Sequence, residues 1–302
     1  MPNMIISEAV QDAMQSGRPI VALESTIFSN LGLPSPTNEE ALTLTLGAVR
    51  SKGAEPAVTA VIDGHVRVGL DGEDYQRILG EAHKTAERDI PAAVSGRWPV
   101  GATTVSASLA IAAMAGIEVF ATGGIGGVHR GSAETGDVSA DLGAISRHPV
   151  VTVCAGAKAF LDIAGTLERL EMLSVPVVGY RTDEFPMFYA RSSGLPVPLR
   201  LDSAEDVAHL AMERFAWNTG GVLLGVPIPE DDALSADEIQ SGMSDALATA
   251  AREGITGAAV TPFVLAEISE SLDGQNIPAN LALSENNARV AAEVAVAIAS
   301  MS

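Results

Sequence analysis

The chain has 302 residues, of which 47% are hydrophobic, and its formal net charge at pH 7 is -20. A chain of this length and hydrophobicity can bury a large core, so we expect an ordinary globular protein. Nucleic acids and anionic membrane surfaces are polyanions, so the negative charge of the chain argues against both as partners. Its single cysteine, Cys154, excludes an internal disulfide and a zinc site built from several cysteines, and cytoplasmic residence is the expectation.

Residues 1–19 predict an amphipathic helix rather than an export signal. They lack a basic segment that leads into an apolar one, and Gly17 and Pro19 would end a helix. The most apolar stretches, such as Ala107 to Gly116, are shorter than the roughly 20 residues that a membrane-spanning helix needs. We therefore expect a soluble protein.

From the N-terminus to about residue 226, short apolar runs alternate with segments of helical periodicity. This alternation predicts an α/β protein, a three-layer α/β/α sandwich with helices on both faces of a sheet. Asp63-Gly64 is typical of a tight hairpin turn between Val58–Ile62 and Val66–Leu70, so the sheet should be mixed and largely parallel. The predicted strands are Ile20–Leu23, Val58–Ile62, Glu118–Ala121, Val150–Cys154, Val175–Gly179 and Gly221–Val226.

From about Ala204 onward the helical pattern dominates, and these helices should pack outside the sheet. No flexible linker, charge block or repeat marks a boundary, so residues 1–302 are expected to form one domain. The predicted helices are Ala204–Phe215, Ala236–Glu253, Pro262–Leu272 and Ser284–Ile298.

Only three lysines occur in the chain, against 15 arginines, which raises the question of why arginine would not serve at those positions. Lysine can form a Schiff base and can lose its proton when it is desolvated, whereas arginine does neither. Lys158 lies where the run Val150–Cys154 passes through Ala155–Ala157 into a helix-like segment, a position that suits an amine nucleophile. A general drift from lysine to arginine would explain the scarcity equally well. Taken alone, Lys52 and Lys84, each near the end of a predicted helix, are interpreted as solvated charges.

Five glycines occur in the nine residues from Gly123 to Gly131, directly after a predicted strand. Ligands of open α/β sheets bind at the carboxyl ends of strands. Glycines permit positive φ and can present backbone N–H groups to an anion, and Arg130 could add a charge-assisted contact to phosphate. The spacing matches neither a P-loop nor a complete dinucleotide fingerprint. The alternative is a tight loop that packs on a neighbouring layer.

A second polar cluster follows, in which Asp137, Ser139 and Asp141 alternate with apolar residues. In an extended chain these three side chains would share one face, where their oxygens could converge. Hard cations such as Mg²⁺ and Mn²⁺ take one or two carboxylates and complete their coordination with water. The alternative is a capping turn that opens a helix at Asp141.

Glu24 interrupts the apolar strand-like run that begins at Ile20, at its carboxyl end. A carboxyl group in such a position is expected to have a raised pKa and to serve as a general acid or base.

These segments and several others give the chain a resemblance to a known family over nearly its whole length. The chain resembles the pseudouridine-5'-phosphate glycosidases, or indigoidine synthase A-like proteins, through the order and spacing of its motifs. The motifs are ALEST, which contains Glu24, the K-x-x-x-R-D-I-P run from Lys84 to Pro91, GATTVSA, FATGGIGGVHRG, DVSADL, VCAGAK and the long stretch VVGYRTDEFPMFYARSSGLPVPLRLDS.

The resemblance implies an enzyme that reversibly cleaves the C–C glycosidic bond between C1′ of ribose 5-phosphate and uracil, as a homotrimer with a divalent metal, usually Mn²⁺. It implies that Lys158 is the nucleophile, forming a Schiff-base adduct at C1′ of the ring-opened sugar, and that Glu24 moves protons. Asp137 would hold the metal ion. The residues expected to contact the substrate are Lys84, Val105, His129, Ser139, Ala140, Asp141 and Asn287, to which the glycine-rich segment adds Arg130.

The chain also departs from the family pattern at four places. A family histidine after ESTI is absent and one residue is inserted within Phe28–Pro36. The N-P-x-P motif has become Val226–Pro229, G-K has become Gly257-Ala258, and T-F-D has become Thr135-Gly136-Asp137. Polar side chains and one ring are thus lost, while the lysine and sugar-phosphate motifs are retained.

These departures favour a changed aglycone with an unchanged sugar. The favoured activity is that of a C-glycosynthase of the alnumycin type, which attaches ribose 5-phosphate to an aromatic, polyketide-type acceptor. One alternative is a uracil-releasing pseudouridine-5'-phosphate glycosidase. The other is a non-catalytic sugar-phosphate binding protein, against which the retention of Glu24, Asp137 and Lys158 argues.

Overall fold

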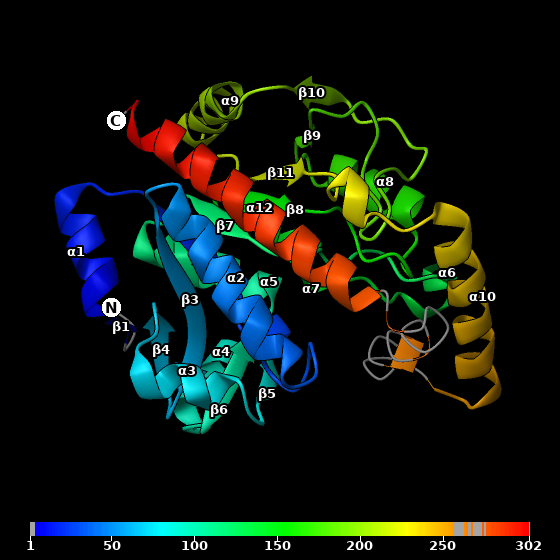
Figure 1. Cartoon of the computed structure of the whole chain (residues 1–302), viewed down its shortest axis with the longest axis horizontal. Helices are drawn as coiled ribbons and strands as arrows, with labels where there is room; N and C mark the ends of the chain where they lie inside the picture. Colours follow the sequence, from blue (N-terminus) through cyan, green and yellow to red (C-terminus); the bar gives the residue numbers. More distant parts are fainter. Residues whose placement is uncertain (1–3, 256–262, 265–266, 268–273, 275, 302) are drawn as a thin grey trace.

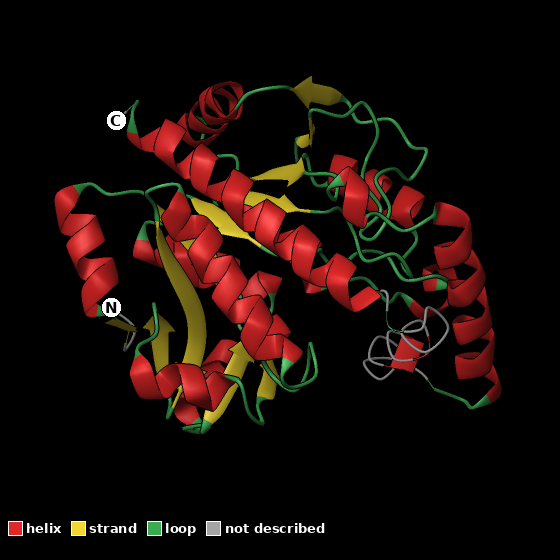
Figure 2. Cartoon of the chain, in the orientation of Figure 1, coloured by secondary structure: helices red, strands yellow, loops and turns green. Residues whose placement is uncertain are grey.

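The computed structural model of the chain describes residues 4–255, 263–264, 267, 274 and 276–301. Their core is a mixed, largely parallel sheet with helices on both faces (Figures 1 and 2). This arrangement confirms the three-layer α/β/α sandwich expected from the alternating pattern. The helix predicted over Pro262–Leu272 falls mostly outside the described residues. Among the described residues, no helix has the length and apolarity needed to cross a bilayer.

The sheet is parallel except where β3 pairs antiparallel with β4 and β6. The long strand β3 joins two regions, because its first half pairs with β2 and its second half with β4 and β6. The strand order is β1 (Met4–Ile6), β4 (His65–Val68), β3 (Glu55–Ile62), β2 (Ile20–Leu23), β7 (Val119–Ala121), β8 (Val151–Cys154), β11 (Val222–Gly225), β9 (Val177–Tyr180) and β10 (Leu199–Leu201), with β6 (Val100–Thr103) beside β3 and β5 (His83–Thr85) beside β6.

The six predicted strands all form, with boundaries that differ by a few residues. They form because a strand covered by helices on both faces needs apolar side chains on both, as in β2 and β8. The predicted hairpin also forms: Asp63 and Gly64 both adopt positive φ, 51° and 78°, as a two-residue turn between twisted antiparallel strands requires.

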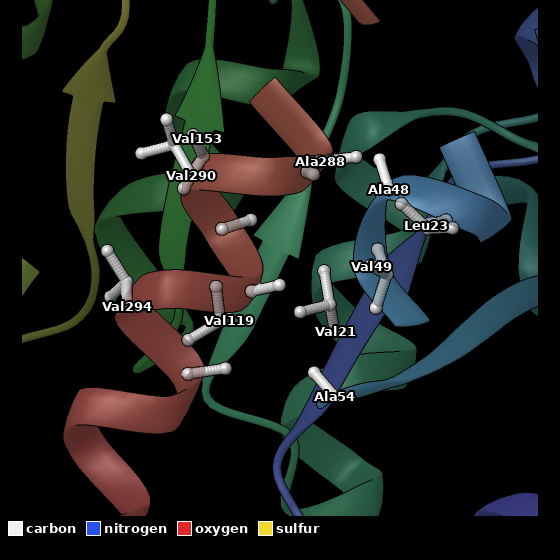
Figure 3. Close-up of a cluster of buried hydrophobic side chains, with 14 of the residues drawn as sticks. Val21, Leu23, Ala48, Val49, Ala54, Val119, Val153, Ala288, Val290 and Val294 are labelled. Carbon is white, nitrogen blue, oxygen red and sulfur yellow. The ribbon is translucent and has the colours of Figure 1, made fainter. Parts of the chain in front are cut away.

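Helices α2 (Thr37–Ser51), α9 (Ala204–Ala216) and α12 (Asn276–Ala299) cover one face of the sheet. Figure 3 shows Ala288, Val290 and Val294 of α12 in the same apolar cluster as residues of α2 and of strands β2, β7 and β8. The alanines of α12 let it approach α2 closely, and α12 thereby crosses the middle of the sheet (Figure 1). This position brings the N-terminal half of α12 to the carboxyl ends of β2 and β7.

The other face is covered by α1 (Glu8–Ser16), α5 (Val105–Ala115), α7 (Ala140–Arg147) and α8 (Ile163–Met172). The expected N-terminal helix forms over Glu8–Ser16 and ends at Gly17, which adopts the left-handed conformation. The prediction was wrong for Met4–Ile6, which pair with β4 as strand β1. Further α-helices among the described residues are α3 (Gly72–Ile78), α4 (Ile90–Ser95), α6 (Ser132–Thr135) and α10 (Ala236–Arg252).

Two expectations about the lysines were wrong. Lys84 lies on strand β5 and not at a helix end, because β5 pairs parallel with β6 and sets Lys84 opposite Ala102. Lys158 lies in a loop, and α8 begins only at Ile163, where the side chain of Asp162 accepts a hydrogen bond from the Gly165 N–H. The helix N-terminus is therefore farther from Lys158 than the sequence indicated.

Candidate active site

The candidate active site lies where three adjacent parallel strands end. The strand register places Leu23 of β2 beside Ala121 of β7, and Ala121 beside Val153 of β8. The next residue after Leu23 is Glu24 and the next after Ala121 is Thr122, so these two side chains emerge at one edge of the sheet. The loop that follows β8 carries Lys158 to the same edge. Ligands of open α/β sheets bind at this edge, where the parallel strands have their carboxyl ends.

The carboxyl group of Glu24 has a perturbed pKa. Burial raises its pKa, while the positive charges of Lys158 and Lys84 and a hydrogen bond from the Thr122 hydroxyl act to lower it. Asp141 contributes a smaller increase, and the net result is a pKa above the ordinary range of glutamate. Glu24 therefore lies within electrostatic reach of both lysines. Such a carboxyl group holds a proton more readily than an exposed one.

Buried hydroxyl groups fix the segment that carries Glu24. The Ser25 hydroxyl lies 3.1 Å from the Thr103 hydroxyl and accepts a hydrogen bond from the Thr103 N–H, while Thr26 donates to the Thr103 carbonyl. Thr59, also buried, lies 2.9 Å from the Thr103 hydroxyl. Thr103 is the last residue of β6, and β6 pairs with the strand of Lys84. The network thus links the positions of Glu24 and Lys84.

The glycine-rich segment Gly123–Gly131 is a tightly packed loop, the alternative left open by the sequence. Of its five glycines only Gly131 has a positive φ, 77°. A Cβ atom on Gly126 or Gly127 would overlap the side chain of Ser139 or Thr166. These positions are glycines because their neighbours leave no room for a side chain. Since none of Gly123, Gly124, Gly126 and Gly127 has a positive φ, no anion-binding nest of positive-φ glycines forms there.

Several backbone hydrogen bonds connect this segment to the loop that carries Lys158, and two of them involve Ile125. The Ile125 N–H donates to the Gly156 carbonyl at 3.0 Å, and the Lys158 N–H donates to the Ile125 carbonyl at 3.1 Å. Lys158 is half-buried. The glycine-rich segment therefore positions the backbone of the proposed nucleophile.

The side-chain oxygens of Ser139 and Asp141 accept backbone N–H groups, as in the capping alternative, whereas Asp137 is partly exposed. The Ser139 hydroxyl caps α7 by accepting a hydrogen bond from the Asp141 N–H. The buried carboxylate of Asp141 accepts the Ser106 N–H at 3.0 Å and the Gly126 N–H at 2.9 Å. Asp141 therefore ties α5 to the glycine-rich segment, as in the capping alternative, and brings this segment beside the first turn of α5.

Asp137 fits a divalent cation of the hard class. Its carboxylate is 43% exposed, and Oδ2 lies 3.8 Å from Nδ1 of His129. Within the described residues no group of three His, Cys, Asp or Glu side chains clusters in a way that would hold a metal. One carboxylate with water in the other positions is nevertheless a common arrangement for Mg²⁺ and Mn²⁺. A cation here would be held by Asp137. The side chain of Arg130, which is expected to contact the substrate phosphate, is exposed.

Asn287 lies on α12, on the sheet face covered by α2 and α9, and stabilises the backbone directly after β7. Its Nδ2 donates to the carbonyls of Thr122 and Gly123, at 2.9 and 3.2 Å. Its buried Oδ1 has no hydrogen-bond partner among the described residues, so one acceptor is available beside the site. The structure thus brings together Glu24, Lys84, Asp141, Lys158 and Asn287.

The remaining predicted substrate contacts lie around this group. Val105 is buried in the first turn of α5, directly before Ser106. Ser139 is half-buried, and Ala140 is exposed at the first position of α7. Thr122 was not predicted from the sequence.

Comparison with known proteins gives a consistent result. The family model described as indigoidine synthase A like protein matches residues 9–297. The pseudouridine-5'-phosphate glycosidases of Methylobacterium nodulans and Sorangium cellulosum are 48% and 47% identical to the chain. Both alignments cover 99% of the chain, with 89% and 95% of the relatives.

Solved structures are similar over the same length. The prealnumycin C-glycosynthase AlnA, in complex with ribulose 5-phosphate, has a TM-score of 0.92 at 37% identity, covering 99% of this chain and 97% of that one. An indigoidine synthase A-like protein from Thermotoga maritima has a TM-score of 0.86 at 34% identity, covering 99% and 98%.

Proposed function

Because this chain belongs to the indigoidine synthase A-like family and is an enzyme of C–C glycosidic bond chemistry, we propose that it cleaves pseudouridine 5′-phosphate to uracil and ribose 5-phosphate. The observation that carries this proposal is the position of Glu24 within electrostatic reach of Lys158, at one edge of the sheet. A C–C bond has no heteroatom leaving group to protonate, so cleavage requires an electron sink at C1′. A lysine imine provides one.

Glu24 and Lys158 can share the first proton transfer. The Lys158 ammonium passes a proton to the Glu24 carboxylate, and burial of Glu24 favours its protonated form. Glu24 then donates this proton to the ring oxygen O4′ while the electrons of the uracil ring break the C1′–O4′ bond. The free amine of Lys158 adds to C1′, which is now conjugated with the ring.

Cleavage of the C–C bond follows from this adduct. Uracil C5 takes a proton, the nitrogen lone pair of Lys158 forms the C1′=N bond, and the electron pair of the C1′–C5 bond remains with uracil. Water then hydrolyses the imine, which releases ribose 5-phosphate and regenerates the lysine. Glu24 is the group placed to move protons in these steps.

The phosphate and the cation would lie on the α7 side of the site. Lys84 and Arg130 supply positive charge, and the Ala140 N–H opens α7 beside the capping Ser139. Asp137 would hold Mn²⁺ or Mg²⁺, which when bound neutralises negative charge on the substrate. In this proposal His129, Val105, Asp141 and Asn287 shape the sugar-binding region.

A C-glycosynthase reaction with an aromatic acceptor is the second candidate. It is favoured by Gly136, where a Cβ atom would meet nothing within 4 Å, so the ring lost beside Asp137 leaves open space. Val226, another altered position, lines a hollow that does not include Glu24. The stronger identity to glycosidases, 48% against 37% for AlnA, supports release of uracil as the first candidate.

The test of the lysine mechanism is reductive trapping. The protein is incubated with ribose 5-phosphate and borohydride, and the modified peptide is mapped by mass spectrometry. We expect one adduct, on Lys158, in the wild type and in a Lys52→Arg control, whose lysine pairs with Glu293 at 2.8 Å on the surface. Labelling that persists in Lys158→Arg, or its absence from the wild type, would overturn the mechanism and favour a non-catalytic binding protein.

A second assay distinguishes cleavage of pseudouridine 5′-phosphate from the C-glycosynthase reaction. Uracil release from pseudouridine 5′-phosphate is followed by absorbance, in the presence of Mn²⁺. Rapid turnover supports the glycosidase. A protein that traps ribose 5-phosphate on Lys158 but releases no uracil favours the C-glycosynthase.

A further inference from the structure

The hollow lined by Val226 lies at the carboxyl ends of β9 and β11, beside α12 and apart from the candidate active site. Its volume is about 470 Å³, in the range of small-molecule sites. None of the residues that line it belongs to the group around Glu24 and Lys158. Three of its lining residues are arginines, Arg181, Arg191 and Arg289, although the chain carries a net charge of -20.

Two of these guanidinium groups have no carboxylate partner. Within the described part of the chain, Arg181 and Arg191 form no salt bridge, whereas Arg289 pairs with Glu293 at 3.1 Å. Asp232 and Glu285 also line the hollow, but neither forms a salt bridge with these arginines among those residues. Arg181 and Arg191 are therefore not held in ion pairs, although the hollow also contains carboxylates.

Contacts with neighbouring groups nevertheless fix both guanidinium groups in place. Arg181 donates through Nε to the Asp202 carbonyl at 2.9 Å and lies 4.9 Å above the ring of Tyr180. Arg191 donates through Nη1 to the Ile228 carbonyl at 2.6 Å. A guanidinium has five N–H donors, so each arginine keeps several for a ligand. These contacts reduce the side-chain entropy that would be lost when an anion binds.

The rest of the hollow is partly apolar. Val226, Pro227 and Pro229 line it along the segment that follows β11. Asn286 fixes this segment to α12 by donating to the Pro227 carbonyl at 3.3 Å. A ligand that fits must therefore carry both an anionic group and an apolar part.

We propose that this hollow binds a small organic phosphate, separately from the catalytic site. Its phosphate dianion accepts charge-assisted hydrogen bonds from Arg181 and Arg191, and its apolar part packs on Val226, Pro227 and Pro229. Phosphate fits better than a carboxylate because its larger number of oxygens can accept hydrogen bonds from both guanidinium groups at once. The binding needs no turnover, so it stands independently of the proposed reaction.

The test uses phenyl phosphate as the probe and isothermal titration calorimetry on the full chain. Binding at the catalytic site is weakened first by the double substitution Lys84→Met and Lys158→Met. We expect this variant still to bind phenyl phosphate. Adding Arg181→Gln and Arg191→Gln should weaken binding at least about tenfold, as expected for the loss of charge-assisted contacts.

Arg200→Gln is the matched control, since Arg200 is paired with Asp183 and Asp202 at 2.7 and 2.9 Å. It should change the affinity less than about twofold. If the arginine variant is poorly folded, as judged by its thermal melting, Ala282→Asp adds a carboxylate to the hollow from α12 and should weaken binding equally. Loss of binding in the lysine variant, or unchanged binding in the arginine variant, would overturn the proposal. So would a changed oligomeric state of the ligand-free arginine variant in sedimentation, because the arginines would then serve a contact between copies.

Discussion

The hydroxyl of Thr122 donates a hydrogen bond to Oε1 of Glu24. The two residues follow paired strands, β2 and β7, and the backbone register alone sets them side by side. The hydrogen bond stabilises the carboxylate form of Glu24 and so opposes the effect of burial on its pKa. In the proposed mechanism, Thr122 would thus adjust how readily Glu24 accepts the proton of Lys158.

Replacing Thr122 with valine should move the acid limb of the pH–rate profile to higher pH. Below its pKa the Glu24 carboxyl group already holds a proton and cannot accept one from Lys158, so activity falls. Thr122→Val removes the hydrogen bond that lowers this pKa, and activity should therefore be lost at a higher pH than in the wild type. Thr122→Ser keeps a hydroxyl and should leave the limb in place. A limb that stays or moves to lower pH in Thr122→Val would contradict this role for Glu24.

Asp141→Asn should destabilise the fold by about 1–3 kcal/mol in urea unfolding. Each oxygen of Asp141 accepts one backbone N–H, from Ser106 and from Gly126, and an amide can accept only one of them. The control is Asp162→Asn, because Asp162 caps α8 through a single oxygen and asparagine caps helices as well as aspartate does. Equal losses in the two variants would show that the double contact of Asp141 has no special role in stability.

Two glycine substitutions should have opposite effects on stability. Gly127→Ala places a Cβ against the side chain of Thr166, whose hydroxyl accepts the Val128 N–H, and should cost about 1–3 kcal/mol. Gly47→Ala lies on α2, where a Cβ would meet nothing within 4 Å, and should stabilise by about 0.5–1 kcal/mol. Thermal melting of both variants tests whether the loop contains glycines because its neighbours leave no room for side chains. A neutral Gly127→Ala would mean that the loop has room that the structure does not show.

The sequence predicted the central strands because their signal is local. Each of β2, β7 and β8 is an apolar run that must be covered on both faces, so composition alone identifies it. Strand β5 gave no such signal: its three residues, His83 to Thr85, lie in a charged stretch and are held by pairing with β6. Pairing partners distant in sequence cannot be read from a single chain, and Lys84 was misplaced for that reason.

The residues of the candidate site also divide into those with a local sequence signal and those whose place depends on distant contacts. Glu24 and Lys158 stood out because a carboxylate that breaks an apolar strand and a rare lysine are unusual in one sequence. Thr122 is an ordinary residue until the register of β2 and β7 is known. Asp141 was expected to face a ligand, but its carboxylate is occupied by the N–H groups of Ser106 and Gly126, the first of them far away in sequence.

Asp137→Asn should weaken the binding of Mn²⁺ at least about tenfold, because a neutral amide oxygen is a poorer ligand for a hard cation than a carboxylate. Mn²⁺ binding can be measured by electron paramagnetic resonance of the free ion, without turnover. Glu134→Gln is the control, since Glu134 is an exposed carboxylate of the same segment and should leave the affinity unchanged. If both variants lose affinity equally, the cation is attracted by the general negative charge of the surface, and Asp137 is not its ligand. If only Asp137→Asn loses it, the exposed carboxylate beside His129 is the ligand, and the ion lies next to the segment that positions Lys158.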